Sequence, residues 1–102
     1  MTTINGSNVH KLIVACDAGM GSSVMLASTL KSQLKKQNVT VEHSPVNSIP
    51  DDADVIVCHE GLAERARGVV GDKPIIPFKV FLGDPAVTKV VNAIKNGDDI
   101  NG

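Results

Sequence analysis

Two short stretches of the chain are apolar without interruption. Leu12–Ala15 and Val55–Cys58 are rich in branched side chains, a pattern typical of a strand buried on both faces of a sheet. Val39–Glu42 alternates apolar and polar residues, which indicates a strand with one wet face at a sheet edge. Pro74–Pro77 predicts a short last strand. We therefore expect a sheet whose first and third strands are central.

Apolar residues at helical spacing predict three helices around this sheet. The first covers about residues 22–37, and the last begins with Asp84 as N-cap and Pro85 as first helical residue. The apolar stripes of the three helices are Ala27, Leu30 and Leu34; Leu62, Ala63, Ala66 and Val69; and Val87, Val90, Val91 and Ile94.

The alternation of strands and helices predicts an α/β fold. A chain of 102 residues suits one domain, here a three-layer sandwich with a four-stranded parallel sheet in the order 2-1-3-4 and three helices, Rossmann/flavodoxin-like. Residues 10–96 are expected to form the domain, between flexible tails at 1–9 and 97–102. In this order the chain reverses direction between strands 1 and 3, and ligands bind at the carboxyl ends of such strands. The loop after strand 1 begins with Cys16.

Composition excludes several classes of function. The net charge is -1, and with two Phe and no Trp or Tyr the chain lacks base-stacking platforms, so no nucleic-acid partner is expected. Two distant cysteines and three scattered histidines do not have metal-finger spacing, so neither a metal nor a cofactor is expected. No secretory signal and no apolar run long enough to span a bilayer is present, which predicts a cytoplasmic domain without membrane insertion.

The segment from Cys16 to Ser23 combines a thiol with an anion site. Gly19 and Gly21 allow a sharp turn that aims backbone N–H groups inward, and a helix beginning near Ser22 adds its free N–H groups and the positive end of its dipole. A phosphate-sized dianion fits these donors. The same donors lower the pKa of a cysteine, to about 3.5–7.5 at helix N-termini, and the thiolate is the nucleophile. Candidate site residues are Cys16 as the nucleophile and Asp17, Ala18, Gly19, Met20, Gly21, Ser22 and Ser23 as the phosphate-binding loop.

Rival phosphate loops fit this segment less well. A Walker loop requires Gly-Lys-Ser/Thr, which is missing here. A Cys-dependent phosphatase requires an arginine six residues after the cysteine, and that position is Ser22. Without the guanidinium, attack by water loses its main stabiliser. This favours a carrier of the phosphoryl group, with a low-molecular-weight phosphatase-like hydrolase and a non-enzymatic module that senses sugar flux as alternatives.

The stretch Leu12–Ser23 resembles the IIB component of the bacterial phosphoenolpyruvate-dependent sugar phosphotransferase system, most closely the mannitol type. Cys58–Ala66 is similar to the segment after strand 3 in mannitol IIB domains. The resemblance implies that Cys16 is the phosphorylated cysteine, that the donor is a phosphohistidine of a IIA protein, and that the acceptor is a sugar held by the membrane permease IIC, mannitol, ascorbate or another polyol. It also implies work at the inner face of the membrane, and we expect a monomer.

Several residues outside the Cys16 loop allow more than one interpretation. His59 and Glu60 follow strand 3, which the sheet order brings beside the Cys16 loop. They line the rim where a partner docks, or His59 bonds the phosphoryl oxygens, or the two form a solvated helix start. Cys58 is expected to pack in the core, with a regulatory disulfide to Cys16 as the alternative. Asp84-Pro85 is explained by helix capping, with a general-acid role as the alternative, and Arg65 and Arg67 are expected on a solvated helix face.

Overall fold

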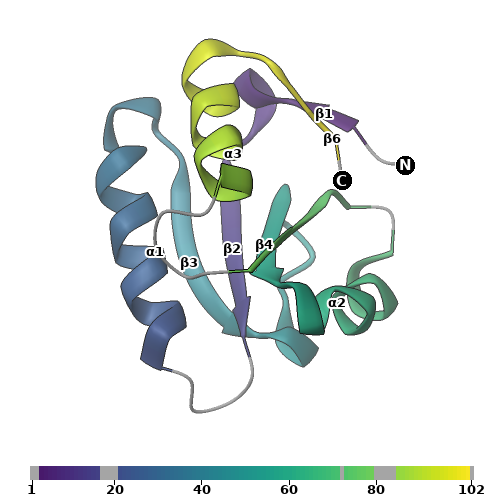
Figure 1. Cartoon of the computed structure of the whole chain (residues 1–102). Helices are drawn as coiled ribbons and strands as arrows, with labels where there is room; N and C mark the ends of the chain where they lie inside the picture. Colours follow the sequence, from purple (N-terminus) through teal and green to yellow (C-terminus); the bar gives the residue numbers. More distant parts are fainter. Residues whose placement is uncertain (1–2, 17–20, 72, 80–84, 102) are drawn as a thin grey trace.

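The centre of the molecule is a four-stranded parallel sheet with the order β3-β2-β4-β5 (Figure 1). The computed structural model describes residues 3–16, 21–71, 73–79 and 85–101. The four strands are β2 (Lys11–Cys16), β3 (Thr40–Pro45), β4 (Val55–His59) and β5 (Ile75–Phe78). When the four strands of this sheet are numbered 1 to 4 in chain order, their order in space is 2-1-3-4. The predicted topology is thus confirmed.

Burial along the strands follows from their sequence patterns. Residues 12–14 of β2 and 55–58 of β4 are 0% exposed, because both strands have a neighbour on each side and helices above and below. The edge strand β3 buries Val41 and Ser44 and exposes the rest. Because these two residues are three positions apart, they lie on opposite faces, so the alternation predicted for this strand is not continued along it. The two central strands are those with the continuous apolar runs.

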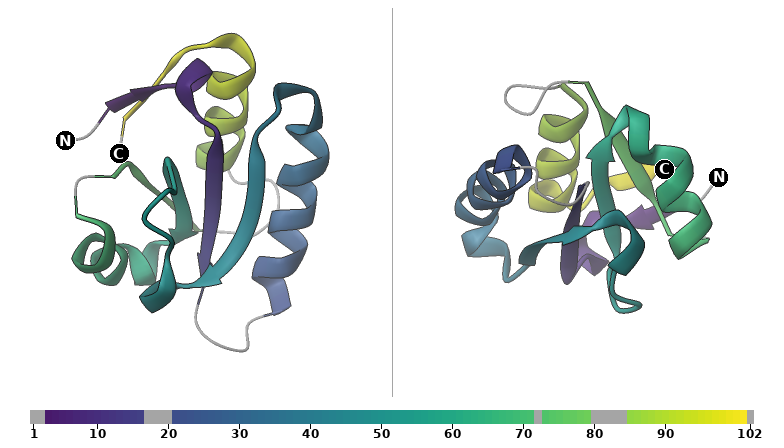
Figure 2. Two further views of the ribbon diagram at one scale, coloured as in Figure 1. Left: turned by 180° about the vertical axis from the view of Figure 1, so that it is seen from behind. Right: turned by 90° about the horizontal axis from the view of Figure 1, so that it is seen from below.

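Helices cover both faces of the sheet (Figure 2). Helices α1 (Gly21–Gln33) and α3 (Pro85–Asn96) pack on one face, and α2 (Ala63–Val70) packs on the other. Each face has its own core. The larger core includes Leu12, Val14, Leu26, Leu30, Val57, Phe78, Val90 and Ile94, and the smaller includes Ile13, Ala15, Val46, Ile56, Cys58, Leu62 and Ala66. The fold is a single three-layer α/β domain of the flavodoxin-like type.

The chain ends differ from the expected tails. Residues Thr3–Asn5 form strand β1, which pairs antiparallel with β6 (Asp99–Asn101). Its Ile4 is opposite Ile100, which is buried in the larger core. A single apolar residue in each three-residue strand is too weak a pattern to reveal a strand from the sequence.

Gly6 fixes this ribbon of β1 and β6 against α3. It opens the 3₁₀ turn η1 (Gly6–Asn8), and its N–H donates to the carbonyl oxygen of Asp98 at 2.7 Å. A Cβ atom at this position would lie 2.1 Å from the carbonyl oxygen of Ala93, so only glycine permits this approach.

Helix α1 ends earlier than predicted. Its regular part stops at Gln33, and a 3₁₀ turn η2 (Lys35–Gln37) follows, ending at Asn38 with a φ of 58°. Asparagine tolerates this left-handed conformation better than most residues. The other 3₁₀ turns are η3 (Val46–Ser48) and η4 (Glu60–Leu62). Helix α3 begins at Pro85 as predicted, and its predicted N-cap, Asp84, lies outside the described residues.

Candidate functional site

Cys16 is the last residue of the central strand β2. Its neighbour in β3 is Pro45, and the preceding residue, Ala15, is paired with Cys58 of β4. Helix α1 begins at Gly21. Residues 17–20 of the predicted loop lie outside the described residues, and Gly21, Ser22 and Ser23 are described through the backbone of the first turn of α1. The predicted nucleophile, Cys16, and the N-terminus of α1 at Gly21 are therefore the two ends of one short loop.

This connection lies at the switch point of the sheet. From β2 the chain crosses by α1 to β3 on one side, and it then returns past β2 to β4 on the other side. The loops that follow β2 and β4 consequently diverge at the carboxyl edge, which is where open α/β sheets bind ligands. Helix α1 has no acidic residue in its first turn that would oppose an anion.

His59 is the last residue of β4 and lies in the row that follows the Ala15–Cys58 pair. It caps η4: its Nδ1 accepts a hydrogen bond from the N–H of Gly61 at 3.2 Å. Its half-buried ring also meets the ring of Phe78 edge to face, with 6.0 Å between centroids and 89° between planes. Glu60, the other predicted rim residue, is exposed at the start of η4.

A family model described as "PTS system, Lactose/Cellobiose specific IIB subunit" matches residues 11–93, a range that includes Cys16 and His59. The chain belongs to this IIB family of the phosphotransferase system. The family predicted from the Cys16 loop is thus confirmed.

Curated relatives of this IIB chain agree with that assignment. It is 39% identical over 92 residues to a "PTS system mannitol-specific EIICB component" of Halalkalibacterium halodurans, with 88% of this chain and 20% of the relative covered. It is 35% identical over 94 residues to the component of the same name in Bacillus subtilis (90% and 20% covered). A "mannitol-specific cryptic EIICB component" of Escherichia coli K12 is 38% identical over 90 residues (86% and 19% covered). The chain spans about one fifth of the length of these relatives.

The second cysteine of the IIB chain lies in an environment unsuited to a nucleophile. Cys58 is 0% exposed in the smaller core, and it is a free thiol. Burial raises the pKa of this thiol from 9.0 to about 11, and the positive charge of Arg67 offsets only part of that rise. Cys58 therefore packs in the core, as predicted, and its raised pKa keeps the thiol protonated at neutral pH.

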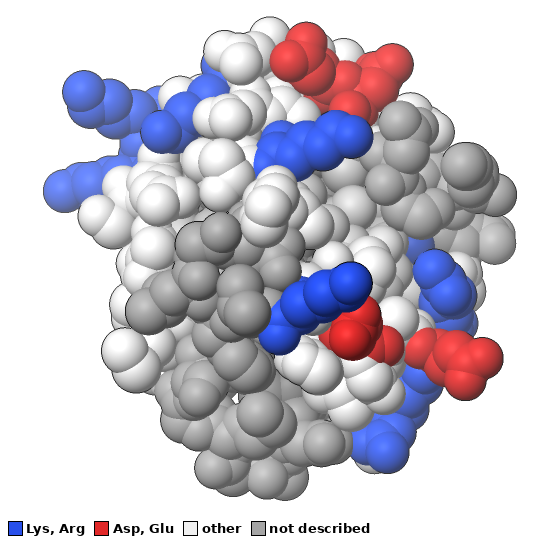
Figure 3. All heavy atoms as spheres, viewed as in Figure 1, with Lys and Arg blue, Asp and Glu red and all other residues white. Residues whose placement is uncertain are grey.

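Basic and acidic side chains of the described residues gather at separate places on the face shown in Figure 3. Basic residues gather over the far end of α1 and over η2, where Lys31, Lys35 and Lys36 lie, and acidic residues gather over the turn between α3 and β6 (Figure 3). Arg65 and Arg67 are exposed on α2, as predicted. Lys31 is the first charged residue of α1. An anion at its N-terminus would be held by backbone N–H groups and the helix dipole.

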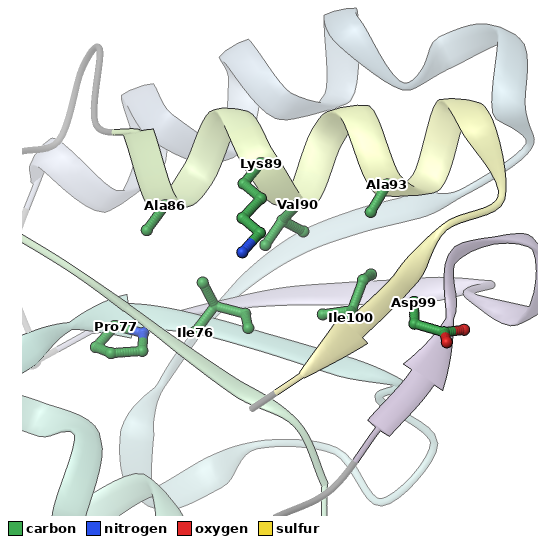
Figure 4. A pocket seen from close by; sticks show the side chains of 8 residues that line it. All are labelled: Ile76, Pro77, Ala86, Lys89, Val90, Ala93, Asp99 and Ile100. Atoms are coloured by element: carbon green, nitrogen blue, oxygen red, sulfur yellow. The ribbon is translucent and has the colours of Figure 1, made fainter.

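The described residues also enclose an apolar groove at the side of the sheet. It has a volume of about 280 Å³ and lies between β5, α3 and β6 (Figure 4). Ile76, Val90 and Ile100 point into it, and Lys89 and Asp99 lie at its rim. The groove runs beside β5 and does not include the ends of β2 and β4.

The described part of the chain was searched for metal sites and for membrane-spanning helices. Within residues 3–16, 21–71, 73–79 and 85–101, no cluster of three His, Cys, Asp or Glu side chains has the arrangement of a metal site. Over the same residues, none of the helices has the length and apolar character needed to cross a membrane.

The contact between His59 and Phe78 was not predicted from the sequence. Phe78 closes β5 and is paired in register with His59, so their rings lie on the same face of neighbouring strands. The sequence contained a signal for this contact. The predicted sheet order places β4 beside β5, and an aromatic residue lies at the end of β5.

Proposed function

We propose that this chain is the IIB component that carries the phosphoryl group on Cys16 between a IIA protein and a sugar bound to IIC. The observation that supports this most is the position of Cys16. It ends the central strand at the switch point, and α1 begins at Gly21 on the same edge. Membership of the IIB family supports the same assignment.

In the first step the thiolate sulfur of Cys16 attacks the phosphorus of a phosphohistidine on IIA. The S–P bond forms while the N–P bond breaks, and the electron pair of that bond returns to the imidazole nitrogen, which takes up a proton. The N–H groups at the start of α1 stabilise the thiolate before attack and the phosphoryl oxygens afterwards. Because both roles use backbone donors, the site needs no metal.

In the second step a hydroxyl oxygen of the sugar attacks the phosphorus. The O–P bond forms, the S–P bond breaks, and the hydroxyl proton passes to a base on the acceptor side, so the Cys16 thiolate is regenerated. The segment from Cys16 to Ser23 contains no Lys or Arg. Without such a cation attack by water is slow, and the phosphocysteine persists until the acceptor is aligned.

We assign the sugar to mannitol or a related polyol. The support is that the relatives described above are named mannitol-specific EIICB components. The domain would act at the inner face of the membrane while docked to IIC.

The two cysteines provide a matched test. Purified protein is incubated with phosphoenolpyruvate and the upstream phosphocarriers, including IIA, and its intact mass is measured. The parent chain and Cys58→Ala are expected to gain one phosphoryl group, and Cys16→Ser is expected to gain none. A label that persists on Cys16→Ser would overturn the assignment.

The same preparations separate carrier from hydrolase. Phosphorylated protein should lose its label slowly in buffer and rapidly when membranes that contain IIC and mannitol are added. Rapid turnover of an aryl phosphate by the parent chain would contradict the carrier and favour the phosphatase-like alternative. Stable phosphorylation without transfer to any sugar would favour the flux-sensing module.

A further inference from the structure

We infer that a cluster of three lysines at the far end of α1 docks on a membrane surface rich in anionic phospholipid. Lys31, Lys35 and Lys36 form this lysine cluster. The inference rests on the proposed function only in placing the domain at the inner face of the membrane. The contact is peripheral, and it inserts no segment into the bilayer.

The lysine cluster lies in a part of the sequence that carries no negative charge. No Asp or Glu occurs between Asp17 and Glu42, a stretch that contains all of α1 and η2. The three lysines are exposed. None of them forms an ion pair with another described residue. Their positive charges are therefore not neutralised by the described part of the chain.

Stabilisation of α1 does not account for all three lysines. Lys31 lies in the last turn of α1, where a cation interacts favourably with the negative end of the helix dipole. Lys35 and Lys36 lie beyond α1, in η2. The repulsion between these neighbouring cations decreases when an anionic surface faces them.

The backbone that carries the lysine cluster is anchored to the larger core. Leu34, between α1 and η2, is 0% exposed, and its carbonyl oxygen accepts a hydrogen bond from the N–H of Gln37 at 3.0 Å. Asn38 then leads the chain toward β3 with a φ of 58°. Because this backbone is already ordered, little conformational freedom is lost when the cluster meets a surface.

The lysine cluster is remote from the proposed site of phosphoryl transfer. Helix α1 begins at Gly21 on the carboxyl edge of the sheet and runs back toward the amino edge, where β3 starts at Thr40. At a rise of about 1.5 Å per residue, Lys31 lies about 15 Å along α1 from Gly21. Contact at the cluster is consequently separate from contact at the carboxyl edge.

Acidic residues elsewhere on the molecule do not cancel this local charge. Asp54 accepts hydrogen bonds from two N–H groups at the start of β2, and Asp52 pairs with the ammonium of Lys11. The acidic residues over the turn between α3 and β6 are separate from the basic ones (Figure 3). The net charge of -1 is thus unevenly distributed, and the far end of α1 is positive.

The chemistry of the lysine cluster favours lipid over a protein partner. Ammonium groups on flexible stems suit a diffuse field of negative charge, and the cluster contains no arginine or aromatic side chain of the kind that anchors protein interfaces. The exposed residues between the lysines are Ser32 and Gln33, both polar. Each lysine near an anionic membrane surface strengthens binding about fivefold, so three strengthen it roughly a hundredfold.

Two paired charge reversals test the inference with equal changes in net charge. Lys35→Glu together with Lys36→Glu alters the lysine cluster. Lys89→Glu together with Lys95→Glu alters two exposed lysines on α3 and is the matched control. Sedimentation with vesicles of phosphatidylglycerol and phosphatidylcholine at low salt measures the binding of each full chain, and thermal unfolding verifies that each is folded.

The parent chain is expected to bind the anionic vesicles and not vesicles of phosphatidylcholine alone, and its binding should weaken as salt is added. The reversal of Lys35 and Lys36 should weaken binding at least about tenfold, and the control reversal less than about threefold. Phosphorylation of Cys16 by IIA should proceed at the same rate with and without vesicles, because the cluster and the carboxyl edge are separate.

A parent chain without affinity for anionic vesicles would overturn the inference. Equal weakening by the two reversals would also overturn it, since only net charge would then matter. Intact vesicle binding with slower phosphorylation by IIA in the Lys35 and Lys36 variant would assign the cluster to an acidic protein instead. All three results leave phosphorylation of the parent chain on Cys16 in place, whereas its failure would refute the proposed function.

Discussion

Cys58 lies between strands and helices that leave its thiol no access to water. Since burial raises its pKa from 9.0 to about 11, the folded chain keeps the thiol proton at a pH where the unfolded chain has lost it. The contribution of the protonated thiol to the free energy of unfolding is therefore fully present below pH 9. It decreases as the pH rises toward about 11.

Comparison with Cys58→Ala isolates this effect, because the other titrating groups are common to both chains. The parent chain is expected to be the more stable at neutral pH, and its advantage should shrink between pH 9 and about 11. Urea unfolding at several pH values measures the difference. A difference that stays constant with pH would refute the raised pKa.

Two aspartates beside the start of β2 allow a second comparison at this scale. Asp54 Oδ2 accepts hydrogen bonds from the N–H groups of His10 and Lys11 at 2.7 and 3.0 Å. Asp52 pairs with the Lys11 ammonium at 3.2 Å, but its side chain is 70% exposed. We expect Asp54→Ala to lower the free energy of unfolding by about 1–2 kcal/mol, because two backbone donors lose a charged acceptor.

Asp52→Ala is the control, with an expected loss below about 1 kcal/mol, since exposed ion pairs contribute little. Chemical denaturation gives both values. A larger loss for Asp52→Ala than for Asp54→Ala would contradict this ranking.

At the scale of elements, the close approach of η1 to α3 makes a glycine indispensable. The Cβ atom introduced by Gly6→Ala would meet the carbonyl oxygen of Ala93 at 2.1 Å and its carbonyl carbon at 2.6 Å. Backbone atoms of a helix cannot move aside cheaply. We expect a loss of about 1–3 kcal/mol, the usual cost of overpacking.

Gly68→Ala is the matched control, because a Cβ atom there would have no atom within 4 Å. It lies in α2, where alanine favours helix by up to about 1 kcal/mol, so this variant should be slightly stabilised. Thermal unfolding compares the pair. Equal stability of the two variants would mean that η1 is not held against α3.

Elements with strong patterns could be predicted from the sequence, and elements fixed by distant contacts could not. The apolar runs of β2 and β4 identify central strands because only burial on both faces requires them. The ribbon of β1 and β6 depends on pairing across nearly the whole chain and on Gly6. Likewise, the position of Cys16 at the carboxyl end of a central strand follows from topology, whereas the cap that His59 forms on η4 depends on one N–H group, that of Gly61.

For the molecule as a whole, we expect the protection of backbone amides against hydrogen exchange to decrease from the centre of the sheet to the ribbon of β1 and β6. Strands β2 and β4 are bonded on both sides and covered by two layers of helices. The ribbon has two strands of three residues each. Amide hydrogens of Ile13 and Ile56 are therefore expected to exchange with deuterium far more slowly than those of β1 and β6.

Hydrogen exchange followed by NMR tests this order residue by residue. The protection of β5 and β3 should be intermediate, because each lies at an edge of the sheet. Exchange in the ribbon as slow as in β2 would contradict the prediction.

The pairing of Thr3 with Asn101 has a consequence for any polypeptide joined to this domain. These two residues lie side by side toward the amino ends of the parallel strands, while β2 ends with Cys16 at the opposite, carboxyl edge of the sheet (Figure 1). A tether at either end would therefore join the domain on the side away from the carboxyl edge. Under the phosphoryl transfer proposed above, such a tether would leave the carboxyl edge open to both the donor and the acceptor.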